Sequence, residues 1–253
     1  MPISKNEIPI LEYDSESTAL LRHDRQENIR FPKRLVFAFL GDKVESYASQ
    51  HCGEILDVFE TIAGRTNIYR VNFHGQTLCL CTAPLDASAA VQLLDWLIGH
   101  GVESVVAVGS CGALVPLPEG YFLIPVKALR DEGVSYHYLP PHRYVDTCPE
   151  NNRKIKAVLQ AHSLPYLECT TWTTDGFFRE TGNMVAYRRE EGCGVVEMEC
   201  AGMAACAQFR GVKFGQLLYT ADTLADAAHD ERGWGLDTMD MALELGLKIA
   251  ASL

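Results

Sequence analysis

The sequence predicts an α/β fold: a single domain of three layers, α/β/α, around a twisted mixed central sheet that is mostly parallel. Two observations indicate this class. From residue 34 onward, short apolar runs typical of buried strands alternate with segments of helical periodicity, and no internal repeat or low-complexity tract interrupts them. The chain has 253 residues, of which 47% are hydrophobic, so it is long enough for one large buried core.

The predicted strands are mostly short apolar runs of the length of a buried strand. They cover residues 35–40, 77–82, 104–108, 166–171, 194–198 and 212–220. In parallel sheets, ligands bind beyond the carboxyl ends of the strands. The polar and aromatic residues that fall at these ends are Gly41, Ser110, Phe177, Glu199 and Asp222.

The predicted helices lie between these strands and carry residues typical of helix ends. They cover residues 44–52, 86–101, 149–162, 199–210 and 238–252. Asp86 caps the start of the second helix, and Gly101 stops it. Pro149 lies in the first turn of the third helix, where a missing N–H costs no hydrogen bond.

Residues 1–33 are predicted to form a polar N-terminal extension, and residues 34–253 to form the main domain. The extension carries the charged residues Glu12, Asp14, Glu16, Arg22, Arg25 and Arg30. We expect it to wrap around the domain or around a neighbouring subunit. Residues 1–7 lack the apolar core of a signal peptide, which predicts a cytoplasmic protein.

Composition argues against several classes of function. A net charge of -11 disfavours nonspecific binding to nucleic acid or to an acidic membrane surface. No apolar segment approaches the ~18 residues of a membrane-spanning helix. The nine cysteines are scattered and include no CxxC pair. This pattern is typical of reduced, buried thiols and not of a metal site.

The most informative stretch places two glutamates at a strand-to-helix junction and an aspartate at the end of the next strand. Glu197 and Glu199 lie at the start of a helix rich in alanine and glycine. Small side chains let this helix lie close to the sheet, so the two carboxylates cannot be ordinary surface charges. Buried acids are rarely left unpaired, and ligand hydroxyls are natural partners. Asp222 ends the next strand, where a buried acid suits a proton transfer.

Three motifs together resemble the nucleoside phosphorylase and nucleosidase superfamily, which includes hexameric purine nucleoside phosphorylases, uridine phosphorylases and methylthioadenosine nucleosidases. They are Val108-Gly109-Ser110-Cys111-Gly112-Ala113, Val196-Glu197-Met198-Glu199-Cys200-Ala201 and Thr220-Ala221-Asp222. The resemblance extends from Leu35 to the C-terminus. It implies an enzyme of nucleoside metabolism that cleaves an N-glycosidic bond, of a purine nucleoside because Asp222 is retained, and passes the pentose to phosphate or to water.

By this resemblance, Asp222 is the acid that protonates or hydrogen-bonds a purine at N7 as negative charge develops on the departing base. The alternative is a cap for the following loop. Arg232 matches an arginine that tunes this acid, with a surface arginine as the alternative. Glu199 accepts hydrogen bonds from the ribose hydroxyls while Met198 packs on the sugar. For Glu199 the alternative is a buried glutamate tied to backbone amides.

The remaining site residues implied by the resemblance contact the base and the sugar. Phe177 stacks on the base, with core packing as the alternative role, and Glu197 is also assigned to the base. Gly109 and Ser110 open a predicted turn whose groups hold phosphate or a ribose oxygen. The alternative for that turn is a tight connection without a ligand.

The first predicted strand ends at Gly41, at the site for phosphate or water. Phosphorylases of this family carry one arginine four residues after this glycine and another two residues before the Gly-Ser motif; here these positions are Glu45 and Ala107. Methylthioadenosine nucleosidases carry a glutamate at the first position, where it activates water. For Glu45 the alternative is a helix-start glutamate favoured by the dipole. Arg65 lies where a neighbouring subunit contributes a phosphate arginine, so both acceptors stay open.

Two other functions also stay open. A uridine-type phosphorylase is favoured by the segments 130–133 and 135–138, whereas Thr181 and Asn183 replace the residues that read uracil. A non-catalytic protein would bind a nucleoside without consuming it. The resemblance further implies a homodimer or homohexamer, no metal or organic cofactor, and phosphate as a possible co-substrate.

Overall fold

The computed structural model describes residues 3–21, 30–226 and 228–253. Its strands are β1 (Arg34–Ala38), β2 (Glu54–Thr61), β3 (Gly64–Phe73), β4 (Gln76–Thr82), β5 (Ser104–Ala113), β6 (Phe122–Asp131), β7 (Tyr144–Asp146), β8 (Tyr166–Thr174), β9 (Cys193–Glu197) and β10 (Lys213–Thr223). Its helices are α1 (Lys43–Gln50), α2 (Ala87–Gly99), α3 (Ser135–Tyr138), α4 (Pro149–Ala161), α5 (Gly182–Glu190), α6 (Cys200–Arg210) and α7 (Met239–Ser252), with short 3₁₀ helices η1 (Pro9–Leu11), η2 (Phe177–Arg179) and η3 (Leu236–Thr238). Every strand and helix predicted from the sequence is present, with its ends moved by a few residues.

The described strands form one mixed sheet in which five strands close into a ring. The order is β10-β6-β8-β9-β5-β1-β4-β3-β2, with β7 paired to β6. Because β10 pairs with both β6 and β5, the strands β10, β6, β8, β9 and β5 close on themselves. Strand β1 pairs in parallel with β4 and β5, and β5 pairs in parallel with β10. The antiparallel pairs are β2 with β3, β3 with β4, β6 with β10, β6 with β7, and β5 with β9. The predicted α/β class with a mixed central sheet is confirmed.

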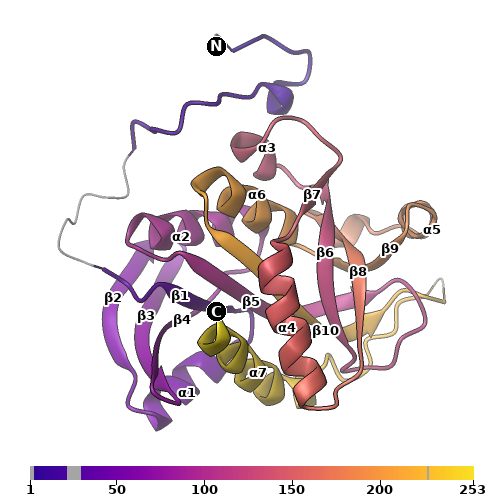
Figure 1. Ribbon diagram of the computed structural model, residues 1–253. Helices are drawn as coiled ribbons and strands as arrows, with labels where there is room; N and C mark the ends of the chain where they lie inside the picture. Colours follow the sequence, from indigo (N-terminus) through magenta and orange to yellow (C-terminus); the bar gives the residue numbers. More distant parts are fainter. Residues whose placement is uncertain (1–2, 22–29, 227) are drawn as a thin grey trace.

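Helices cover both sides of the sheet (Figure 1). Helices α2 and α6 share one core with the sheet, and α1, α4 and α7 share the other. Leu35 and Val105 point into the first core, and their neighbours Val36 and Val106 point into the second. Side chains alternate across a strand, so a strand covered on both faces has to be apolar throughout. This explains why β1 and the first half of β5 are continuous apolar runs.

Strand β5 runs further than predicted, which corrects the turn expected at residues 109–112. Strand β10 pairs with β5 as far as Ala113, and β9 pairs with its last two residues. These partners supply ladder hydrogen bonds beyond the apolar run, so the chain stays extended there. The glycines serve close packing: a Cβ on Gly109 would lie 3.0 Å from the Cβ of Phe39.

Several elements were not predicted from the sequence: the β2–β3 hairpin, strands β6 and β7, and helices α3 and α5. Strand β2 is an edge strand with no fully buried residue, so its sequence carries no continuous apolar run. Strand β6 contains Pro125 and Lys127, residues that are unusual in a central strand. Their pairing is therefore decided by the neighbouring strands and not by local composition.

The described part of the N-terminal extension contacts the domain of the same chain. The guanidinium of Arg210 donates to the carbonyl oxygen of Ser17 at 2.9 Å. Phe31 is buried, with its ring centroid 5.1 Å from that of Trp96. Arg22 and Arg25 lie outside the described residues. Within the part of the chain that is described, no helix combines the length and apolar character needed to cross a bilayer.

Candidate active site

The carboxyl-terminal half of β5 has the end of β10 on one side and β9 on the other, and these three strands carry or lead into the three sequence motifs. Gly112 of β5 pairs with Val196 of β9, and Asp222 lies at an irregularity in β10 beside the end of β5. Ser110 is exposed between buried neighbours. Because side chains alternate along a strand, Ser110 and Gly112 share a face of β5. The strand ends that carry Glu199 and Asp222 therefore flank one stretch of β5 that opens to solvent at Ser110.

The carboxyl group of Asp222 is held from two directions. Its Oδ2 lies 2.9 Å from Nε2 of His229. Its Oδ1 lies over Gly112, where an added Cβ would come within 3.2 Å of that oxygen and 3.0 Å of Cγ1 of Val196. Glycine at position 112 therefore leaves room for the carboxylate to lie close to β5. The Asp222 side chain is 19% exposed, which leaves part of it open to a ligand.

Glu180 is a third titratable group near Asp222, and the sequence analysis missed it. It follows η2 directly and is half-buried. Burial raises the pKa of Glu180 to about 7, with a further upward contribution from the charge of Asp222 and an opposing one from His229. Carboxyl groups that titrate near neutral pH are concentrated at functional sites. No local signal marks Glu180, because its partners come from a different strand and loop.

Glu199 is buried where β9 passes into α6. Its Oε1 accepts a hydrogen bond from the backbone N–H of Asp86 at 2.7 Å, and only 6% of the residue is exposed. Burial, followed by the charge of Glu197, raises the pKa of Glu199 to about 8. Asp86 has φ 82°, a conformation that L residues rarely adopt, and its side chain caps α2 through Ser88 N. The amide tie expected as the structural alternative is thus present, and it orients the carboxyl group.

Glu197 is saturated by donors from the protein itself. The four donors are the hydroxyls of Thr171 (3.2 Å) and Thr173 (2.6 Å) on Oε1, and the amides of Glu199 (2.9 Å) and Cys200 (2.7 Å) on Oε2. A carboxylate has about four acceptor positions. This geometry speaks against the base-binding role expected for Glu197, and we assign it instead to holding the junction between β9 and α6.

Apolar side chains are exposed on the loops around these carboxylates. Phe177 and Phe178 follow β8, with ring centroids 4.1 Å apart, and both are exposed. Leu85 precedes α2 and Trp234 lies between β10 and α7, and both are exposed as well. Met198, predicted to pack on the sugar, is half-buried beside Glu199. Phe177 is therefore not a core residue, which removes the alternative role expected for it.

Glu45 belongs to the first turn of α1 and faces the end of β4. The hydroxyl of Thr82 lies 3.1 Å from both oxygens of its carboxyl group. Residues 82–86 connect this contact to Glu199, since the same loop ends at the amide that binds Glu199. Gly41 precedes α1 with φ 57°, the left-handed turn that favours glycine. Glu45 and Glu199 are thus tied to opposite ends of one loop.

The two predicted arginines make other contacts. The guanidinium of Arg232 donates to the carbonyl oxygen of Leu117 at 2.8 Å. The side chain in contact with Asp222 is that of His229, where the sequence analysis expected Arg232. Arg65 lies on the exposed β2–β3 hairpin, with its Nε 3.8 Å from a carboxylate oxygen of Glu60. Within one chain Arg232 is therefore not in contact with Asp222, and the role of Arg65 in a neighbouring subunit's phosphate site stays a prediction.

The segment that resembled uridine phosphorylases has a structural use. Arg130 is buried, and its guanidinium donates to the hydroxyl of Ser135 and to the carbonyl oxygens of Leu139 and Pro140. It thereby holds α3 and the turn after it. These contacts give Arg130 a structural role that does not depend on a pyrimidine ligand.

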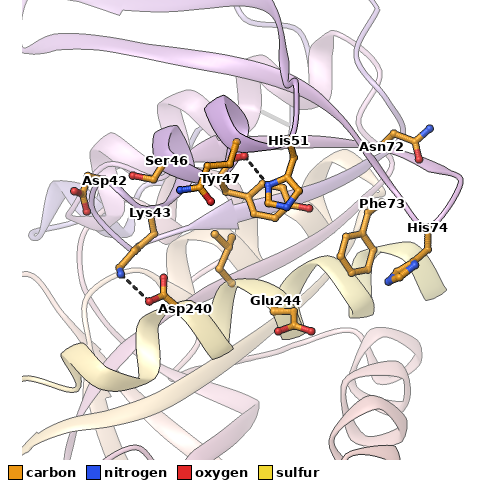
Figure 2. A pocket seen from close by; sticks show the side chains of 12 residues that line it. Asp42, Lys43, Ser46, Tyr47, His51, Asn72, Phe73, His74, Asp240 and Glu244 are labelled. Carbon is orange, nitrogen blue, oxygen red and sulfur yellow. Dashed lines mark hydrogen bonds and ion pairs between the residues drawn. The ribbon is translucent and has the colours of Figure 1, made fainter.

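A separate hollow of about 830 Å³ lies between α1, the β3–β4 turn and α7 (Figure 2). It contains the ion pair of Lys43 with Asp240, at 2.8 Å, and the stacked rings of Tyr47 and His51. Glu199 and Asp222 are not among the residues that line it. This hollow is therefore distinct from the candidate active site.

All nine cysteines are free thiols, and seven of them are buried. Burial raises the pKa of Cys169 to about 12, so this thiol stays protonated and unreactive near neutral pH. Among the described residues, no group of three or more histidine, cysteine, aspartate or glutamate side chains is arranged to hold a metal ion.

Comparisons with known proteins agree with this fold. A purine nucleoside phosphorylase of DeoD type from Chromobacterium violaceum is 23% identical over 179 residues, which cover 64% of this chain and 71% of that protein. A solved uridine phosphorylase from Vibrio fischeri superposes with a TM-score of 0.76 at 17% identity, over 90% of this chain and all of the other. A solved AMP nucleosidase from Bacteroides thetaiotaomicron superposes with a TM-score of 0.70 at 20% identity, over 87% and 88% of the two chains.

At these identities the solved structures establish the fold, and the family rests on a separate match. Residues 33–249 match the family model described as the phosphorylase superfamily. This stretch contains all three motifs that carried the resemblance in the sequence. The chain therefore belongs to the phosphorylase superfamily, whose members are nucleoside phosphorylases and nucleosidases.

Proposed function

We propose that this protein cleaves the N-glycosidic bond of a purine-type nucleoside and passes the pentose to phosphate or to water. The observation that carries the proposal is the pair of unlike carboxyl groups that follow β9 and end β10, the two strands paired with the end of β5. Glu199 is buried and held by backbone, whereas Asp222 is partly open and bound to a histidine. The first suits a fixed contact with the sugar, and the second suits a proton transfer to the base.

Glu199 binds the ribose 2′- and 3′-hydroxyls in this proposal. The amide of Asp86 holds its carboxyl group in one orientation and leaves acceptor positions for the diol. Hydrogen-bond donors favour the ionised carboxylate, so the diol lowers the raised pKa of Glu199 on binding. The charge then opposes the positive charge that develops on the sugar as the bond breaks. Met198 packs on the sugar, and Ser110 contributes its hydroxyl.

Asp222 provides the proton or hydrogen bond that the base needs as it leaves. Negative charge accumulates on the ring nitrogen of the departing base, and an acid at that atom lowers the barrier. Phe177 is exposed near this corner of the site and stacks on the base. Phe178 and Trp234 extend the apolar rim on the neighbouring loops.

The acceptor is bound near Gly41 and Glu45 at the start of α1. Glu45 is engaged by the hydroxyl of Thr82, which orients its carboxylate toward the loop that also contacts Glu199. With a glutamate and Ala107 where phosphorylases carry arginines, a water activated by Glu45 is one acceptor of the pentose. Phosphate is the other, held by Arg65 of a neighbouring subunit in a homodimer or homohexamer. Residues 34–253 form the catalytic domain of a cytoplasmic enzyme, and residues 1–33 are its extension.

The test is a panel of adenosine, inosine, guanosine, methylthioadenosine and uridine, each with and without phosphate, read by release of the free base. Release of a purine is the expected result. Dependence on phosphate identifies a phosphorylase, and release without phosphate identifies a nucleosidase. Release of uracil alone would contradict the purine assignment, and binding of a nucleoside without release of base would identify a binding protein.

The proposed assembly has its own test. Sedimentation measures whether the chain is a dimer or a hexamer. If Arg65 acts across the interface, Arg65→Ala lowers phosphate-dependent turnover without dissociating the oligomer. A monomer with full activity would contradict the proposed assembly.

A further inference from the structure

His229 lies in the loop between β10 and α7, and the fold brings it back against the strand that carries Asp222. Thr223 and Asp230 exchange two backbone hydrogen bonds of 3.0 Å across this loop. The loop therefore folds back immediately after the strand. Nε2 of His229 lies 2.9 Å from Oδ2 of Asp222, and the ring centroids of His229 and Trp234 are 5.8 Å apart.

Of the two paired side chains, His229 is the more exposed to solvent and Asp222 the more buried. The side chain of His229 is 42% exposed, whereas that of Asp222 is 19% exposed. Oδ1 of Asp222 points toward the space beside Gly112, where an added Cβ would come within 3.2 Å of it. A proton taken up from water by the imidazole has a direct hydrogen-bonded route to Asp222.

We propose that His229 is the positioning residue of Asp222 and the source of the proton that Asp222 delivers to the departing base. This inference rests on the proposed cleavage of a nucleoside. The protonated imidazole gives its Nε2 proton to Oδ2 of Asp222, and the carboxylic acid gives one proton to the ring nitrogen of the base. The C–N bond breaks with its electron pair on the base, and the pentose carbon bonds to an oxygen of phosphate, or to the oxygen of a water that gives one proton to Glu45. The neutral imidazole then regains a proton from solvent.

Asp222 and His229 both act on the pKa of Glu180, which places these three groups at one corner. Asp230 is used locally, since its Oδ1 accepts the backbone N–H of Arg232. The guanidinium of Arg232 is bound to Leu117, so within the described residues His229 is the cationic group in contact with Asp222.

The experiment compares two substrates in the full-length oligomer: the purine nucleoside found active in the panel and its N7-methylated analogue. Methylation places on the base the positive charge that protonation would supply, so the analogue needs no proton to depart. His229→Gln retains an N–H donor toward Asp222 but carries no transferable proton. His51→Gln, on the hollow of Figure 2, is the matched control for replacing a surface histidine.

We expect His229→Gln to lower kcat on the parent nucleoside by roughly 10- to 100-fold, the scale of a lost general acid. KM on the parent, and kcat on the N7-methylated analogue, change by less than about threefold, because binding and the pre-charged base do not need the proton. Equal losses on both substrates would show a purely structural role and overturn the proposal. An unchanged kcat on the parent would overturn it as well.

A second measurement does not depend on turnover and separates this inference from the proposed function. In protein with ¹⁵N-labelled histidine, the ¹⁵N chemical shift of Nε2 in His229 is expected to report the hydrogen bond to Oδ2 of Asp222, and Asp222→Ala changes that shift. If wild-type protein releases no base from any nucleoside, the proposed function fails while this signal still reports the pair. An Nε2 shift in His229 that Asp222→Ala leaves unchanged would show that the contact is absent and overturn the inference.

Discussion

Two corners of the candidate site place carboxyl groups at strand ends and treat them differently. Where β9 passes into α6, the carboxyl group of Glu197 accepts four hydrogen bonds from the protein, and Glu199 accepts the amide of Asp86. Where β10 ends, Asp222 contacts His229 and Glu180 titrates near neutral pH. At the first corner the protein's own donors hold the carboxyl groups, and at the second a histidine and a carboxyl group with a raised pKa lie beside Asp222.

This difference separates structural acids from chemical ones in a single site. A carboxylate whose acceptor positions are filled by fixed donors stabilises the fold and has nothing left for a ligand. A carboxylate paired with a titratable side chain exchanges protons without breaking the fold. Removing the first kind should therefore affect stability, and removing the second kind should affect turnover. The following predictions test that division.

The largest effect is expected for Glu197→Ala. The hydroxyls of Thr171 and Thr173 and two backbone amides lose their buried acceptor. Each unsatisfied buried donor costs about 1–3 kcal/mol, so the free energy of unfolding falls by roughly 4 kcal/mol. Denaturant unfolding measures it. The control is Glu168→Ala, which breaks an exposed ion pair with Lys156 that contributes about 0–1 kcal/mol. An equal loss in free energy of unfolding for both variants would contradict the division between structural and chemical acids.

A pH-dependent loss of stability is expected from Glu199. Its pKa is raised by burial from 4.5 to about 8, so folding favours the protonated form. The stability from this group is complete below pH 4.5 and declines as the pH rises toward 8. Relative to Glu199→Gln, which is neutral throughout, the wild-type Tm falls by about 5 °C or more across this interval. Parallel Tm curves for the two proteins would show that Glu199 does not titrate there.

Asp222→Asn is expected to lower turnover without lowering stability. Asparagine keeps the shape of the side chain but supplies no proton, so kcat on purine nucleosides falls by roughly 10²-fold. Because no buried donor loses a filled acceptor, the free energy of unfolding changes by less than about 0.5 kcal/mol. Steady-state kinetics and denaturant unfolding measure the two quantities. Asp240→Asn, which alters the ion pair with Lys43, is the control, and unaltered kcat in Asp222→Asn would remove this residue from the mechanism.

The smallest effect is expected for Glu180→Gln. The pKa of Glu180 is raised to about 7, so the group becomes negative as the pH rises through neutrality. This added charge beside Asp222 opposes the developing charge on the base, and wild-type kcat falls a fewfold above pH 7. In Glu180→Gln that decline disappears. The pH profile of kcat measures it, with Glu190→Gln on α5 as the control, and a decline of the same size in Glu180→Gln would assign it to another group.

Particular residues show what could and what could not be predicted from the sequence. The motif at residues 196–201 predicted a strand-to-helix junction with carboxylates, and the structure has β9 and α6 there. The motif did not reveal that threonines of β8 donate hydrogen bonds to Glu197, because the pairing of β8 with β9 joins separate parts of the chain. Likewise Gly109 and Ser110 were expected in a turn and lie in β5, since their extended conformation depends on β9 and β10.

Local patterns in the sequence were enough to determine the α/β class, the order of the predicted elements and the family, and they predicted the strand ends at which we propose the site. Apolar runs, caps and motif spacing act within a few residues, so a single sequence displays them. Only the tertiary structure decided that β5 continues past its apolar run and that His229 pairs with Asp222. It also decided that Glu180 lies near that pair. These facts depend on contacts between distant segments, and the free energy that selects them comes from strand pairing and burial that no local window contains.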